Sequence, residues 1–176
     1  MYHLFSILAA AATAAVQPAA VTTEQIDIHF VPRTPDQMMS FYEARGFPAA
    51  MIDILSKQCF ITVGIHNKSD DVIWHDLAEW HFSHDGKPLR REHRNYWLGM
   101  WKRMSMPQAS ISTFRWTLIP EQLDYLPDER EGGNIILPRV DGGISVSARF
   151  ATGADRQGDV ITIEYDKLFC AEDEEE

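Results

Sequence analysis

Apolar and polar residues alternate along several stretches of this chain, which is typical of β-strands that bury one face. In residues 60–66, isoleucine and valine occupy every second position, and residues of mixed character lie between them. A similar period marks residues 22–31, 144–152 and 159–165. The last two stretches flank a loop rich in Gly and Asp, so they predict a hairpin.

Two further stretches also predict extended chain. In a continuous strand over residues 74–82, the aromatic side chains would point into the core and the His and Glu side chains would point to solvent. The inward set is Trp74, Trp80 and Phe82, and the outward set is His75, Glu79 and His81. Residues 110–119 alternate in the same way and are rich in β-branched and aromatic residues, so they predict another strand.

Helix signals interrupt these strands in two places. Thr34 and Gln37 have the spacing of a capping box around Pro35, and Gly46 fits the glycine that follows the end of a helix. Pro48 can then start a second short helix. This predicts a short N-terminal helical hairpin. Residues 90–104 predict one further helix, because apolar residues recur there at i, i+3, i+4 and i+7. They are Trp97, Met100, Trp101 and Met104.

About seven or eight short strands with turn signals between them favour two packed antiparallel sheets over a parallel sheet with crossover helices. This mainly β pattern resembles an immunoglobulin-like β-sandwich with the helical hairpin and the later helix as insertions. The Cys, Trp and Cys spacing of true immunoglobulin domains is absent, so the resemblance assigns no residue a role. At 176 residues, the chain predicts one such domain, over residues 21–171.

The two ends of the chain differ from its middle. Residues 1–20 contain no Asp, Glu, Lys or Arg and are rich in alanine, which predicts a signal peptide; a retained apolar segment is the alternative. The run is short for a membrane span, so we expect no transmembrane span in the mature chain and export to the periplasm or by secretion. Residues 172–176 are all acidic and predict a disordered tail.

Charge and cysteine content narrow the expectations further. The formal net charge of −10 argues against a nucleic-acid partner, because that binding requires a strongly positive surface. In an oxidising compartment, Cys59 and Cys170 are expected to form a disulfide, and two separate buried thiols are the alternative.

Two sets of residues are candidates for a metal site. The two imidazoles and the carboxylate of His75, Glu79 and His81 would suit zinc or copper if one face of a strand brought them together. The thioethers of Met100, Met104 and Met106 would suit Cu(I). The competing interpretations are a solvated strand face for the first set and a packing surface for the second.

A basic and aromatic stretch is the candidate for binding a partner. Three arginines precede two tryptophans within a predicted helix, in a chain that is otherwise acidic, so an acidic protein or an envelope component would suit this surface. These residues are Arg90, Arg91, Arg94, Trp97 and Trp101. The alternative is that the tryptophans anchor the helix to the sandwich.

Common catalytic signatures are absent from the sequence. It contains no Gly-x-Ser-x-Gly, no His-Glu-x-x-His and no phosphate-binding glycine loop. The sequence therefore favours an exported, non-enzymatic protein that acts by binding or assembly, without a cofactor. The alternative is an exported protein that binds copper or zinc.

Overall fold

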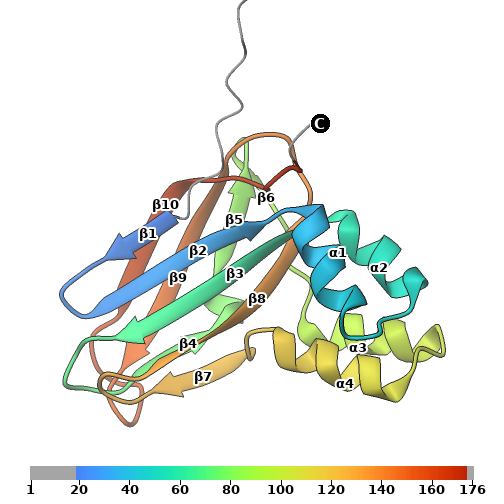
Figure 1. The fold of residues 1–176 in the computed structure, drawn as a ribbon. Helices are drawn as coiled ribbons and strands as arrows, with labels where there is room; N and C mark the ends of the chain where they lie inside the picture. Colours follow the sequence, from blue (N-terminus) through green and yellow to red (C-terminus); the bar gives the residue numbers. More distant parts are fainter. Residues whose placement is uncertain (1–18, 174–176) are drawn as a thin grey trace, which may run out of the picture.

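The computed structural model describes residues 19–173, which form two antiparallel β-sheets with helices packed against one of them (Figure 1). The prediction of a mainly β chain is confirmed. Residues 1–18 of the predicted signal peptide lie outside the described residues, as do residues 174–176 of the acidic tail. None of the helices in residues 19–173 has the length and apolar character needed to cross a membrane.

The first sheet has the strand order β1-β2-β3-β8. The bounds are Ala19–Thr22 for β1, Ile26–Arg33 for β2, Gln58–Asn67 for β3 and Arg130–Pro138 for β8. The second strand continues through Pro32 because β1 pairs only as far as Phe30, so the missing amide hydrogen of Pro32 interrupts no bond with β1.

The second sheet is built around β9 (Ile144–Thr152), which pairs with β10 (Ile161–Leu168) along one edge. Along its other edge, β9 pairs first with β5 (His81–His84) and then with β4 (Ile73–Asp76). Two short strands, β6 (Lys87–Pro88) and β7 (Gln122–Tyr125), extend the sheet beside β5 and β4.

The main hydrophobic core lies between the two sheets and is built by alternation along the strands. Ile28, Val63 and Ile135 come from the first sheet, and Val146 and Phe150 come from the second. All five are buried, as strands with one covered face require. This arrangement leaves the outer face of the first sheet free to receive a second layer.

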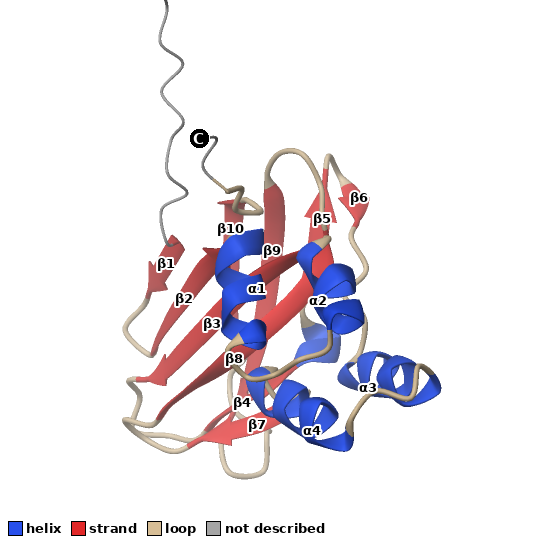
Figure 2. Ribbon diagram, turned by 45° about the vertical axis from the view of Figure 1, so that its right-hand side comes forward, coloured by secondary structure: helices blue, strands red, loops and turns tan. Residues whose placement is uncertain are grey.

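Helices form that second layer (Figure 2). Their bounds are Pro35–Glu43 for α1, Ala49–Ser56 for α2, Arg94–Arg103 for α3 and Gln108–Thr117 for α4. They share a separate hydrophobic cluster with Phe60 and Ile136, which project from the outer face of β3 and β8. The predicted capping box is present at α1, where Thr34 and Gln37 exchange side-chain to backbone hydrogen bonds of 3.2 and 3.3 Å.

The prediction of a strand over residues 110–119 is wrong, because this stretch forms α4. Ile111 and Phe114 are three residues apart, so they lie on one face of a helix, and they pack against Trp97 and Trp101 of α3. The chain therefore carries two helices in this region in place of the single predicted one. Residues with strand propensity fold as a helix here because a neighbouring helix covers their apolar face.

The prediction of one continuous strand over residues 74–82 is also wrong. A 3₁₀ turn at Leu77–Glu79 separates β4 from β5. His75 and His81 are six positions apart, whereas their partners on β9, Phe150 and Ser147, are three positions apart. The three additional residues are an odd number, so the inward-facing parity reverses between β4 and β5. His75 is consequently buried in the core, and only the aromatic residues after the turn point inward as predicted.

The predicted disulfide between Cys59 and Cys170 is confirmed, with a Cα to Cα distance of 5.2 Å. It joins β3 of the first sheet to the segment that follows β10 of the second sheet. Beyond it, Glu172 forms an ion pair with Arg139, and the Asp173 carboxylate accepts a hydrogen bond from the backbone of Asp36 at the start of α1. The first two residues of the acidic tail therefore contact the folded domain.

Candidate functional site

A groove of about 680 Å³ lies where α1 and the end of α4 meet the outer face of the first sheet. Its volume falls within the range of small-molecule sites. Side chains from two helices and three strands line it, and both apolar and polar side chains are among them. They are Arg33, Gln37, Met38, Phe41, Tyr42, Phe60, Thr62, Trp116, Thr117 and Asn134.

Two exposed aromatic side chains form the apolar wall of this groove. Trp116 of α4 is 84% exposed, and Phe41 of α1 is 37% exposed. The guanidinium of Arg45 lies 3.5 Å from the centre of the Phe41 ring, in a cation–π contact. Phe60 and Met38 are buried beside them. Trp116 therefore exposes its indole to water next to other apolar side chains, and a ligand could cover this surface.

The polar floor is a hydrogen-bonded row across three adjacent strands. Thr62 of β3 lies directly opposite Asn134 of β8 and donates its hydroxyl hydrogen to Asn134 Oδ1 at 2.7 Å. The same hydroxyl accepts a hydrogen bond from Arg33 Nε of β2 at 2.9 Å. This row holds the Arg33 side chain in the lining of the groove.

The two helices that flank the groove are joined by a hydrogen bond between side chains. Thr117 donates its hydroxyl hydrogen to the Phe114 carbonyl at 2.7 Å, so the Tyr42 hydroxyl is the donor in its 2.8 Å contact with Thr117. Burial raises the pKa of Tyr42 to about 12, although its contacts with Thr117 and Asn134 oppose this shift. Tyr42 therefore stays protonated and links α1 to α4.

Gly133 allows α4 to reach this position. A Cβ at Gly133 would overlap the backbone of Ile119, which follows α4 and donates a hydrogen bond to the Asn134 carbonyl at 3.1 Å. The chain after α4 therefore lies directly on β8, and this contact places Trp116 over the sheet. Only glycine permits so close an approach.

The charge of the groove is opposite to that of the whole chain. Arg33 is its charged lining residue, and no carboxylate is among the lining residues. Within residues 19–173, Arg33 has no ion-pair partner, and its one side-chain hydrogen bond uses Nε. The groove thus combines a positive charge with an apolar wall.

His75, the first predicted metal ligand, is 1% exposed, and both of its ring nitrogens are engaged. Nε2 lies 2.8 Å from the Pro120 carbonyl, which can only accept, so Nε2 carries the hydrogen. Nδ1 consequently accepts from the Tyr125 hydroxyl at 2.9 Å. Burial lowers the pKa of His75, and the hydrogen bond to Pro120 opposes this shift only in part. The imidazole is therefore a neutral structural group that joins β4 to β7.

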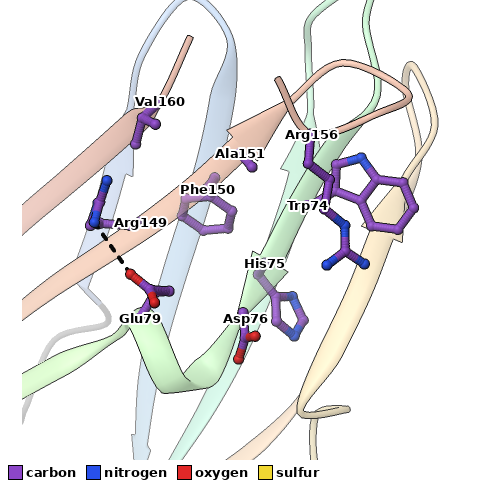
Figure 3. Close-up of a pocket in the computed structure, with 9 residues that line it drawn as sticks. All are labelled: Trp74, His75, Asp76, Glu79, Arg149, Phe150, Ala151, Arg156 and Val160. Carbon is purple, nitrogen blue, oxygen red and sulfur yellow. Dashed lines mark hydrogen bonds and ion pairs between the residues drawn. The ribbon is translucent and has the colours of Figure 1, made fainter. Parts of the chain in front are cut away.

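Glu79 lines the same small pocket as His75 but is paired with another residue, and His81 is not among the residues that line this pocket. Glu79 forms an exposed ion pair of 3.2 Å with Arg149 at one side of this pocket of about 180 Å³ (Figure 3), and His81 is exposed on β5. The structure brings together no group of three His, Cys, Asp or Glu side chains suited to a metal anywhere in residues 19–173. On the opposite side of the same pocket, Arg156 stacks on Trp74.

The predicted methionine site lies at the edge of the helical layer. Met100, Met104 and Met106 are partly buried and pack against the cluster that the four helices share. Their position matches the packing surface that the sequence left open as an alternative.

The basic and aromatic stretch is largely occupied by contacts within the chain. Arg91 forms a bidentate ion pair with Glu121. The Glu121 carboxylate also accepts a hydrogen bond from the backbone N–H of Arg94. The Arg94 guanidinium donates a hydrogen bond to the Leu118 carbonyl. Burial alone would raise the pKa of Glu121, but these hydrogen bonds hold it below its usual value. Trp97 and Trp101 are buried among the helices, and only Arg90 extends into solvent.

The residues that line the groove were not predicted from the sequence. Trp116 was assigned to a strand face, where nothing distinguishes it from its aromatic neighbours. Had the stretch been read as a helix, Trp116 would have fallen on a different face from Ile111 and Phe114. A tryptophan outside the apolar face of a helix was the signal that could have pointed to this site. Arg33 follows the predicted end of its strand at Pro32 and carries no local signature.

Comparisons with known proteins assign no family. No family model matches the chain, and no curated protein does. Among solved structures, the chain is similar to "a putative lipoprotein (ycdA)" from Bacillus subtilis, with 11% sequence identity and a TM-score of 0.41. The similarity covers 86% of this chain and 39% of that chain, so this chain spans about two fifths of the other protein's length. Similarity at this level assigns neither a fold family nor a function.

Proposed function

We propose that this chain is an exported, non-enzymatic binding protein with an immunoglobulin-like fold, and that it takes a small amphipathic ligand into the groove between α1, α4 and the first sheet. The observation that carries the proposal is Trp116, an indole that is 84% exposed at the rim of a groove of about 680 Å³. Its rigid aromatic surface suits ligand binding because little side-chain entropy is lost on contact.

The order of strand pairing supports the immunoglobulin-like part of the proposal. In that fold, strands A, B and E share one sheet and strands C, F and G share the other. Here β2, β3 and β8 pair in the first pattern, and the broken strand β4–β5 pairs with β9 and β10 in the second. The helices then occupy the connections from A to B and from C to E.

Export is supported by the disulfide and by the sequence of residues 1–20. A bond between Cys59 and Cys170 persists in oxidising compartments such as the periplasm or the exterior of the cell. The uncharged, alanine-rich run at residues 1–20 has the composition of a signal peptide.

The neutral dye N-phenyl-1-naphthylamine tests the groove without involving charge. We expect its fluorescence to rise saturably with one site per chain. The Trp116→Ala variant should bind it about tenfold more weakly or worse, because tryptophan is among the residues whose truncation costs most binding energy. Tyr96→Ala is the matched control, because Tyr96 is 46% exposed and lies outside the groove. Equal affinities for the two variants, or no saturable binding to the wild type, would contradict the proposal.

A further inference from the structure

Beyond its shape, the groove is distinguished by the way the Arg33 side chain is hydrogen-bonded. Its Nε donates to Thr62 Oγ1, and Thr62 is in turn held by Asn134 on the next strand. A guanidinium fixed through Nε keeps its two terminal nitrogens free to form a pair of parallel hydrogen bonds. From this geometry we infer that Arg33 anchors the carboxylate of an amphipathic ligand. The inference rests on the proposed function, and it names the chemical class of ligand.

The charge of the site favours a single negative charge on the ligand. Arg91, elsewhere in the chain, is neutralised by Glu121, whereas Arg33 has no ion-pair partner in residues 19–173. Arg33 is half-buried, so water screens its attraction to an anion less than it would at an open surface. A phosphate monoester carries more charge than the one cation that lines the groove would balance, whereas a carboxylate matches it.

The shape of the site requires an apolar body on the same molecule. The polar row of Arg33, Thr62 and Asn134 lies on the strands, whereas Phe41 and Trp116 lie on the helices. A ligand that filled only the polar side would leave the two exposed rings in water. The two halves together fit a carboxylate with a hydrocarbon or aromatic tail, such as a medium-chain fatty acid.

Three probes with the same tail and different head groups test this assignment. Decanoate, decanol and decyltrimethylammonium would be used to displace N-phenyl-1-naphthylamine from the wild-type protein. We expect decanoate to bind at least about tenfold more tightly than decanol, because charge-assisted pairs of hydrogen bonds are the strong ones, and the cationic probe to bind most weakly. This comparison needs no variant, so a folding defect cannot obscure it.

Variants then identify the anchor. Arg33→Gln should remove the preference for decanoate over decanol. Arg33→Lys should retain part of the preference, because it keeps the charge but loses the paired donors. Arg149→Gln is the control, since it makes the same change in net charge on the other sheet.

Each result has a distinct meaning. Equal binding of decanoate and decanol, or equal effects of Arg33→Gln and Arg149→Gln, would overturn the assignment of Arg33 while the dye still binds at the groove. If neither the dye nor any of the three probes binds the wild-type protein, the proposed function fails, and the assignment of Arg33 fails with it.

Discussion

Replacement of His75 by phenylalanine should destabilise the fold at neutral pH and also change how stability depends on pH. The substitution keeps an aromatic ring in a site that is 1% exposed but removes both hydrogen bonds of the imidazole. The buried Tyr125 hydroxyl then lacks its acceptor, and the Pro120 carbonyl lacks its donor. A buried polar group left unsatisfied costs about 1–3 kcal/mol, and Pro120 is only partly buried, so we expect a loss of about 2–4 kcal/mol.

The pH dependence follows from the protonation of the imidazole. Burial lowers the pKa of His75 in the folded state below its usual value of 6.5, so the unfolded chain binds this proton more readily than the folded chain. The stabilisation by neutral His75 is therefore complete above about pH 6.5 and declines as the pH falls toward the folded-state pKa. One proton gives a slope of at most about 1.4 kcal/mol per pH unit. His75→Phe should lack this contribution.

Urea unfolding, followed by tryptophan fluorescence at about pH 7.5, 6.5 and 5.5, measures both effects in one series. His75→Gln should recover part of the stability at neutral pH, because its amide can donate to Pro120, yet it should also lack the pH slope. His81→Phe is the control at an exposed position. The reasoning is refuted if His75→Phe and the wild type have the same free energy of unfolding at neutral pH, or the same slope below pH 6.5.

Two other predictions concern links between distant parts of the chain. Reduction of the bond between Cys59 and Cys170 should lower the free energy of unfolding by about 4–5 kcal/mol, because it releases a loop that spans 111 positions, and urea midpoints with and without dithiothreitol measure this loss. An unchanged midpoint would contradict it. Glu121→Gln should cost about 1.5–3 kcal/mol at pH 7, since the charged hydrogen bonds with Arg91 are weakened. Because the folded-state pKa of Glu121 lies below its usual value of 4.5, the stability of the wild type should decline below that pH and the gap to Glu121→Gln should narrow; a gap that stayed constant down to acid pH would argue against the ion pair.

Local patterns were sufficient to predict several of the longer strands of the two sheets. Alternation in β3, β9 and β10 survives in the structure because each of these strands has one face against the core between the sheets. The same holds for the start of α1, where the capping box of Thr34 and Gln37 is formed within a few residues. The pairing of Cys59 with Cys170 followed from the expected compartment and needed no knowledge of the fold.

The errors arose where a neighbour in space decided the outcome. The spacing of apolar residues in 110–119 is compatible with either a strand or a helix. The helix forms because its apolar face packs against α3. The reversal between His75 and Trp80 depends on three additional residues opposite β9, and no residue type in that stretch marks them. One such insertion moved His75 from the predicted solvent face into the core.

The groove could not be predicted for the same reason, because its parts come from segments far apart in the sequence. Arg33 lies on β2, Thr62 on β3, Asn134 on β8 and Trp116 on α4, and only strand pairing and the seating of α4 on Gly133 bring them together. All of them occupy the outer face of the first sheet or the helical layer, whereas the main core occupies the inner face. Because the main core and the polar groups of the groove are separate sets of residues, we expect Arg33→Gln to change head-group selectivity with little effect on the free energy of unfolding. Displacement of the dye by the three probes and urea unfolding of the same variant measure the two properties separately.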